Sequence, residues 1–364
     1  MISPSTFYDL VSGRRRGISA ACGRGVLRAL EAPYGVAVAW RNRRYDRGTA
    51  DLFRPPVPVI SIGNLTTGGT GKTPLVKWTA HRLRELGLRV AILSRGYRAE
   101  QGGLNDEALE LELDLPDVPH LQNPDRAASA RVAVEELEMQ VLLLDDGFQH
   151  RRLARDLDIV LLDALEPFGF GHLLPRGILR EPRCALRRAD VIVLSRADLV
   201  EAESRLCLKE EARRLAPGAL WCEIRHAPHA LVNARERRPW QLLAGQPVFA
   251  FCGIGNPAGY RRTLDSCGLE IVGWREFPDH HAYTGRDIEE LTARCRESQA
   301  AAAVCTQKDL VKVQLAQLGP VPLWALAIET EFLAGGERLA EMLHNLTRSV
   351  RTEVPLPAGR DDPG

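Results

Sequence analysis

Short runs of apolar residues alternate along this chain with longer segments that carry apolar residues at helical spacing. The runs occupy residues 57–62, 89–93, 141–144, 159–162, 191–194, 248–252, 301–305 and 323–328. Continuous rather than alternating apolar runs are typical of strands that are buried on both faces, as in parallel sheets. The pattern therefore predicts an α/β fold, with a parallel sheet and helices on both of its faces.

A helix is predicted shortly after the first run. Val76, Ala80 and Leu83 fall at positions i, i+4 and i+7, and Gly87 marks the C-terminal end. Pro74 suits the first helical turn, where its missing N–H costs no hydrogen bond. The loop that leads into this helix contains Thr66, Thr67, Gly68, Gly69, Thr70, Gly71, Lys72 and Thr73.

This loop has the setting of a phosphate-binding loop. Its glycines let backbone N–H groups close around phosphate oxygens, Lys72 adds a positive charge at the outer phosphates, and the Thr73 hydroxyl suits Mg2+. The common pattern G-x-x-x-x-G-K-[ST] requires glycine where this chain has Thr66. The loop therefore predicts a nucleoside triphosphate site whose sequence departs from the common pattern at Thr66.

Two acids end the run at residues 141–144. Asp145 and Asp146 have the form of the strand end that supplies a metal-side carboxylate in P-loop enzymes, although an acidic strand end can also cap a helix. The phosphate loop earlier in the chain favours the metal interpretation. Residues 94–98 and 105–107 follow the run at 89–93, so we expect them at the same edge of the sheet, where a plain polar loop is the alternative.

The second half of the chain places Asp279 beside His280. An aspartate can orient an imidazole, although a histidine pair is more often part of an ordinary loop. Residues 225–240 combine histidines, prolines and a basic cluster, which predicts a domain boundary. We therefore expect a P-loop core at residues 49–228, a smaller α/β domain at 229–347 and a tail at 348–364 that frays.

The N-terminal segment, residues 1–48, is basic and rich in apolar residues. It holds nine arginines against three acids, a local net charge of +6. Its longest uncharged stretch, residues 32–40, is far shorter than the roughly 20 residues of a spanning helix. The segment suits a helix on an anionic membrane surface, and an ordinary solvated helix is the alternative.

Composition narrows the remaining possibilities. The chain has 364 residues and a net charge of only +1, so no overall field favours nucleic acid. The eight cysteines show no C-x-x-C spacing, which argues against a zinc site or a disulfide framework. We expect reduced and mostly buried cysteines of a cytosolic protein, with no obligate protein partner evident.

Ten motifs are spread along the chain, at residues 59–64, 68–74, 94–97, 125–126, 145–150, 173–177, 179–182, 253–257, 279–281 and 308–309. Together they resemble one enzyme family, tetraacyldisaccharide 4'-kinase, the lipid A 4'-kinase of Gram-negative bacteria. The resemblance covers about residues 5–345.

The resemblance implies a role for each matching residue. Lys72 and Thr73 take the phosphates of ATP and Mg2+, and Asp145, Asp146 and Glu181 are the metal-side carboxylates. Arg180 faces the phosphates. Asp106 is the catalytic aspartate and pairs with His280, which Asp279 precedes. The family motif has glycine before its aspartate, whereas this chain has Asn105, so the local turn is expected to differ.

The reaction implied is phosphorylation of the 4'-hydroxyl of tetraacyldisaccharide 1-phosphate by ATP, which yields lipid IVA. The resemblance also makes the N-terminal segment a peripheral membrane contact on the cytoplasmic face of the inner membrane.

Three other functions fit parts of the sequence. A partitioning-type regulatory ATPase shares Gly-Gly-x-Gly-Lys-Thr, but that family has lysine where this chain has Thr67. A metallochaperone GTPase is weakly suggested by the guanine-reader-like Ser195-Arg196-Ala197-Asp198. A non-catalytic nucleotide-binding scaffold is disfavoured by Asp106 and by the Asp279-His280 pair.

Overall fold

The computed structural model of the protein describes residues 4–96 and 106–351. Its helices are α1 (Pro4–Val11), α2 (Ile18–Asp46), α3 (Lys72–Glu85), α4 (Asp106–Asp114), α5 (Arg126–Glu135), α6 (Ala202–Leu215), α7 (Pro257–Ser266), α8 (Gly285–Glu297), α9 (Gln307–Val313) and α10 (Gly336–Arg351). Its strands are β1 (Val59–Asn64), β2 (Val90–Ser94), β3 (His120–Gln122), β4 (Val141–Asp145), β5 (Leu157–Asp163), β6 (Val191–Ser195), β7 (Leu220–Val232), β8 (Arg237–Pro239), β9 (Pro247–Cys252), β10 (Glu270–Glu276), β11 (Ala302–Thr306), β12 (Gln317–Leu318) and β13 (Val321–Ala334).

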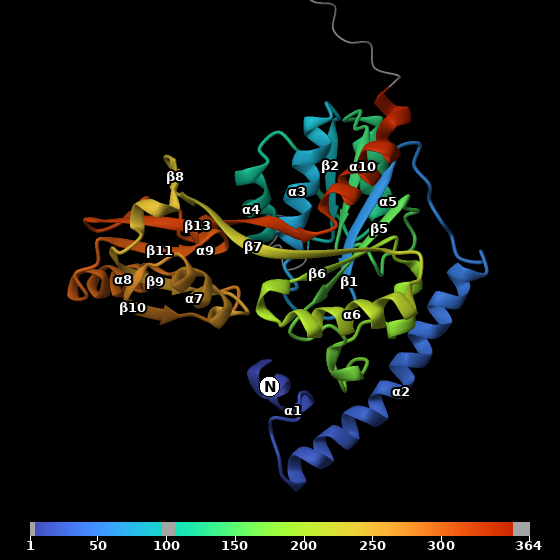
Figure 1. Ribbon diagram of the computed structural model, residues 1–364, viewed down its shortest axis with the longest axis horizontal. Coiled ribbons are helices and arrows are strands. Elements are labelled where there is room, and N and C mark those ends of the chain that lie inside the picture. The colour runs from blue at the N-terminus through green and yellow to red at the C-terminus, as the bar shows by residue number, and fades with distance from the viewer. Residues whose placement is uncertain (1–3, 97–105, 352–364) are drawn as a thin grey trace, which may run out of the picture.

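One sheet runs through the whole molecule, in the order β10-β9-β11-β13-β7-β6-β5-β1-β4-β2-β3. The strands β1 to β6 are parallel to their neighbours, as are β9, β10 and β11. The long strands β7 and β13 pair antiparallel in the middle and join a large lobe to a small one (Figure 1). We call the part around β1 to β6 the large lobe and the part around β9 to β11 the small lobe.

Helices cover both faces of the sheet, as the apolar runs predict. On one face of the large lobe, Ile60 and Ile62 of β1 pack with residues of α3, α4 and α10. On the other face, Leu142 and Leu144 of β4 pack with α5, and residues of β5 and β6 pack with α6. The small lobe repeats the arrangement, with α8 and α9 on one face and α7 on the other.

The predicted domain boundary between residues 228 and 229 falls inside β7. In addition, α10 follows the small lobe in sequence but packs on the core of the large lobe through Leu339 and Leu343. The division into domains therefore stays a prediction.

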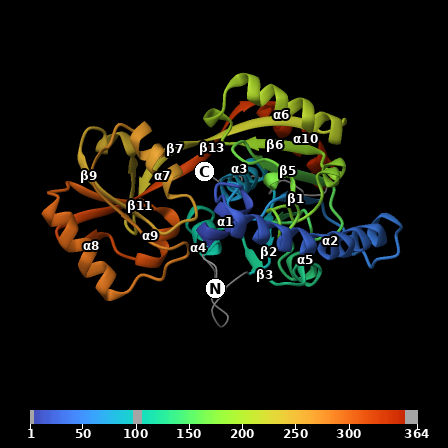
Figure 2. The same ribbon diagram turned by 90° about the horizontal axis from the view of Figure 1, so that it is seen from below.

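The N-terminal residues form two helices, α1 and the 29-residue α2. In both views α2 runs along the large lobe (Figures 1 and 2). No helix among residues 4–96 and 106–351 combines the length and the apolar character needed to cross a membrane. All eight cysteines are free, and five of them are buried.

Candidate active site

The predicted phosphate loop connects β1 to α3, and its glycines have the backbone conformations that the sequence indicates. Gly68 and Gly71 adopt positive φ angles of 114° and 79°, which only glycine adopts at low cost. Lys72 and Thr73 begin α3 directly after Gly71. The unusual Thr66 is buried and forms an isolated antiparallel bridge with Leu179, which joins the start of the loop to the segment before Arg180.

Two residues at the C-terminal end of β6 form hydrogen bonds with the phosphate loop. The buried Ser195 hydroxyl donates to the Thr70 carbonyl over 2.8 Å, and the Arg196 guanidinium donates to the Gly69 carbonyl. In a planar trans peptide the C=O of one residue and the N–H of the next point in opposite directions. Fixing these two carbonyls therefore sets the direction of the N–H groups of Thr70 and Gly71. Ser195 and Arg196, which resembled a weak guanine reader in the sequence, lie against the phosphate loop instead.

A histidine from β7 packs against the same loop. A Cβ atom added to Gly71 would lie 2.2 Å from Cε1 of His226. Burial and the nearby Arg196 charge lower the pKa of His226 to about 4, so its ring is neutral at physiological pH. No local sequence pattern signals this contact, because it joins residues on two distant segments.

Three residues predicted for the site meet in front of the loop. Lys72 Nζ lies 3.3 Å from one carboxylate oxygen of Asp146, and Arg180 donates to the other over 2.7 Å. Burial by itself raises the pKa of Asp146, but the charges of Lys72 and Arg180 outweigh it and lower the pKa to about 2. Asp146 is therefore ionised throughout the physiological range, and its φ of 51° is a rare left-handed conformation for a residue other than glycine.

The carboxylates at the end of β4 fit a magnesium ion. Asp145 is buried at the last position of β4, which pairs with β1 just before the phosphate loop. Mg2+ is usually held by one or two carboxylates together with substrate phosphates, and a Thr73 hydroxyl adds a further oxygen donor. Among the residues that the structure describes, no group of three or more His, Cys, Asp or Glu side chains could hold a metal by itself.

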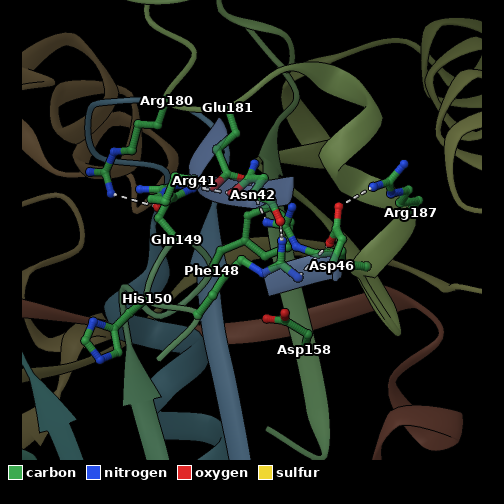
Figure 3. Close-up of polar contacts among 12 residues, drawn as sticks. Arg41, Asn42, Asp46, Phe148, Gln149, His150, Asp158, Arg180, Glu181 and Arg187 are labelled. Carbon is green, nitrogen blue, oxygen red and sulfur yellow. Dashed lines mark hydrogen bonds and ion pairs between the residues drawn. The ribbon is translucent and has the colours of Figure 1, made fainter. Parts of the chain in front are cut away.

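The predicted metal ligand Glu181 is fully buried between two arginines. One of its carboxylate oxygens pairs with Arg41 of α2, and the other lies 2.6 Å from Arg188. Figure 3 shows Arg41 and Glu181 near Arg180. A role of Glu181 as a metal ligand stays a prediction.

The predicted catalytic aspartate begins α4. Asp106 is the first residue of this helix, but its side chain lies outside the described part of the structure, as does Asn105 entirely. Lys77 of α3 forms ion pairs with two residues of α4, because its Nζ atom lies 2.6 Å from an oxygen of both Glu110 and Asp114. The helix that carries Asp106 is thus tied to the helix that begins with Lys72.

The Asp279-His280 pair lies on a turn of the small lobe. His280 Nε2 is 3.9 Å from the Asp279 carboxylate, and both side chains are exposed. The turn is fixed by a hydrogen bond from the His280 N–H to the Gly253 carbonyl. The buried Asp309 accepts a hydrogen bond from the Gly253 N–H, which anchors the neighbouring loop.

Comparison with known proteins identifies the family to which a chain with this site belongs. Residues 24–348 match the family described as Tetraacyldisaccharide-1-P 4'-kinase. The chain belongs to this family.

Relatives in the tetraacyldisaccharide 4'-kinase family match over most of their length. The tetraacyldisaccharide 4'-kinase of Anaeromyxobacter sp. (strain K) is 43% identical, over 93% of this chain and 95% of the relative. That of Syntrophus aciditrophicus is 39% identical, over 81% of this chain and 86% of the relative. A crystal structure of LpxK from Aquifex aeolicus in complex with ATP is 32% identical, with a TM-score of 0.73, and covers 89% of this chain and 99% of its own.

Membership of the tetraacyldisaccharide 4'-kinase family does not favour the partitioning-type ATPase. The residue that distinguishes the two loops, Thr67, donates its backbone N–H to the Ile178 carbonyl over 2.8 Å. In this structure Thr66 and Thr67 both contact the segment that precedes Arg180.

Proposed function

We propose that this kinase transfers the γ-phosphoryl group of ATP to the 4'-hydroxyl of a tetraacylated glucosamine disaccharide 1-phosphate, forming lipid IVA and ADP. The observation that carries the proposal is the cluster that Asp146 and Arg180 form with Lys72 in front of the phosphate loop, in a chain of the tetraacyldisaccharide 4'-kinase family. Positive groups that converge on a phosphate loop stabilise the charge of a transferred phosphoryl group.

The phosphate loop and its neighbours bind the triphosphate. Loop N–H groups and Lys72 hold the outer phosphates, and Arg180 neutralises charge on the transferred group. For this, both cations must exchange part of their contact with Asp146 for contact with phosphate oxygens. Thr73, Asp145 and Asp146, with Glu181 as a further predicted ligand, would hold Mg2+, which when bound neutralises phosphate charge.

The acceptor hydroxyl needs a base because an alcohol is a weak nucleophile. Asp106 accepts the proton of the 4'-hydroxyl as its oxygen bonds to the γ-phosphorus, and the bond from that phosphorus to the β-phosphate oxygen breaks to release ADP. His280, oriented by Asp279, assists Asp106 across the two lobes. General-base help of this kind is worth roughly 10²- to 10⁴-fold in rate.

The substrate's acyl chains favour a reaction at a membrane surface, and the use of ATP favours the cytoplasmic face of the inner membrane. Helix α2 supports a peripheral contact because it exposes a stripe of large apolar side chains. These are Ile18, Val26, Leu30, Val36 and Trp40. The exposed Arg14, Arg15 and Arg16, which precede α2, suit anionic headgroups.

Flotation with phosphatidylglycerol vesicles tests the membrane contact. Val26→Gln should weaken recovery with the vesicles, because it removes apolar surface from the stripe. Leu206→Gln is the matched control, since Leu206 on α6 is equally exposed, at 61% for both residues. Equal recovery of the two variants would contradict the membrane role of α2.

Acceptor-dependent ADP release tests the reaction. The enzyme should release ADP with the tetraacyl disaccharide 1-phosphate and should not do so with the same disaccharide lacking its 4'-hydroxyl. Equal ADP release with the two lipids would show hydrolysis without transfer and would overturn the proposed function.

A further inference from the structure

One segment of the large lobe, residues 172–181, lies between α2 and the phosphate loop. On the loop side, the Arg180 N–H donates to the Leu65 carbonyl over 2.7 Å, and Ile178 accepts from Thr67. On the α2 side, Glu31 accepts from the Leu173 N–H over 2.8 Å. We call residues 172–181 the bridging segment, because it is bonded on both sides.

Arg180 is held by α2 as well as by the phosphate loop. Its carbonyl accepts a hydrogen bond of 3.0 Å from the Tyr34 hydroxyl, while its N–H bonds to the loop. With both backbone groups fixed, the guanidinium reaches Asp146 at 2.7 Å and Gln149 at 3.4 Å. Tyr34 thus fixes the point from which the Arg180 side chain extends (Figure 3 shows Arg180 with Gln149).

The residue after Arg180 provides a second link to α2. Glu181 is fully buried, and its charge is balanced by Arg41 of α2 and Arg188 of the large lobe. A buried carboxylate that loses one of two such partners is destabilised, and it moves or draws in water. Arg41 therefore keeps Glu181, and with it the adjoining Arg180, in place.

The two sides of α2 face different surroundings. At about 100° per residue, Glu31, Tyr34, Val38 and Arg41 fall on one side of the helix. Of these, Val38 is buried, and the other three contact the bridging segment or Glu181 at its end. Of the exposed apolar residues, Ile18, Val36 and Trp40 lie on roughly the opposite side, and Val26 and Leu30 lie between the two sides.

We propose that α2 is a working part of the phosphoryl-transfer site, in which Tyr34 and Arg41 are positioning residues for Arg180. The inference rests on the proposed role of Arg180 at the transferred phosphate. A helix placed on a lipid surface by its apolar stripe thereby sets the position of a phosphate-facing arginine.

Steady-state kinetics of Arg41→Ala and Tyr34→Phe test the proposal. Each should lower kcat by about tenfold, the effect of losing roughly 1.4 kcal/mol of transition-state stabilisation, with a smaller change in the KM for ATP. Arg41→Lys should recover part of the lost kcat because it keeps the charge. Arg43→Ala is the matched control, since Arg43 lies exposed on the same helix, and it should keep the wild-type kcat.

A double-mutant cycle separates positioning from a general structural effect. If Arg41 acts through Arg180, Arg41→Ala should cause little further loss of kcat in an Arg180→Ala background. A full tenfold loss in that background, or a kcat for Arg41→Ala and Tyr34→Phe equal to that of Arg43→Ala, would overturn the inference. Absence of transfer by the wild-type enzyme would instead refute the proposed function. Tyr34→Phe keeps the test open should Arg41→Ala fail to fold, because it removes only a hydroxyl.

Discussion

Replacing Lys77 by methionine should strongly destabilise the large lobe. The Lys77 ammonium is buried against Glu110 and Asp114, with 2.6 Å to an oxygen of each, and the three side chains are only 7–11% exposed. Methionine fills most of the same volume but leaves two buried carboxylates without this cation. Breaking a buried ion pair by removing one partner costs about 3–5 kcal/mol. We expect a loss of that size in the free energy of unfolding at pH 8.

The pH dependence of this loss identifies its cause. In the wild type, burial raises the pKa of Asp114, but Lys77 outweighs burial and the pKa is lowered, so the aspartate stabilises the fold above its unfolded pKa of 3.8. Lys77 has a raised pKa, and its contribution is lost only as the pH rises above 10.5. The contribution of the Lys77–Asp114 pair is therefore constant between pH 5 and pH 8.

In Lys77→Met we expect the pKa of Asp114 to shift in the opposite direction. Without Lys77, we expect burial to outweigh Gln307 and Arg237, the remaining partners of Asp114, so that its folded pKa rises above 3.8. A group with a raised folded pKa loses stability as the pH rises, so the variant should be less stable at pH 8 than at pH 5. The gap from the wild type should accordingly be smaller at pH 5.

Urea unfolding followed by tryptophan fluorescence measures both effects. Arg82→Met is the matched control, because Arg82 on the same helix pairs with Glu85 at the surface, a contact worth about 0–1 kcal/mol. Adding Glu110→Gln and Asp114→Asn to Lys77→Met should recover most of the loss. Equal losses for Lys77→Met and Arg82→Met, or a gap that widens at pH 5, would refute the reasoning.

Three further substitutions probe the phosphate site. Ser195→Ala should raise the KM for ATP by about fivefold, because one hydrogen bond of roughly 1 kcal/mol holds the Thr70 peptide. The exposed control Ser204→Ala should have the wild-type KM. Indistinguishable KM values for the two variants would contradict this role of Ser195. Gly71→Ala should abolish the rise in melting temperature caused by ATP, because its Cβ would overlap His226 at a positive φ, and a wild-type rise would show that the loop has another conformation. Asp106→Ala should lower kcat by about 10²- to 10⁴-fold with little change in ATP affinity, and an unchanged kcat would exclude Asp106 as the base.

Eight of the thirteen strands in the described structure were predictable, because nearly all of these eight are buried on both faces. The eight apolar runs all correspond to strands, from β1 to β13. The strand β7 was not predicted, since its polar His226 and His229 and its Pro228 resemble a linker. These residues lie in β7, which pairs with β13 and runs between the two lobes. Local composition does not distinguish such a strand from a boundary.

The residues of the candidate site also divide into those that a local sequence pattern predicts and those that it does not. Lys72 and Asp146 were predictable because a phosphate loop and an acidic strand end are local patterns, and the structure brings them to 3.3 Å. Arg180 was indicated only by resemblance, because no local pattern connects it to Asp146. The contacts of Ser195, His226 and Arg41 depend on the packing of distant segments and carry no signal in their own neighbourhood.

The most direct test of the central claim is to follow the γ-phosphate itself. The enzyme is incubated with γ-labelled ATP, Mg2+ and the tetraacyl disaccharide 1-phosphate, and the labelled lipid is isolated and the position of its new phosphate determined. We predict one labelled phosphate at the 4' position, and none with Lys72→Ala. Label only in inorganic phosphate, or label in lipid with Lys72→Ala at the wild-type level, would contradict the account.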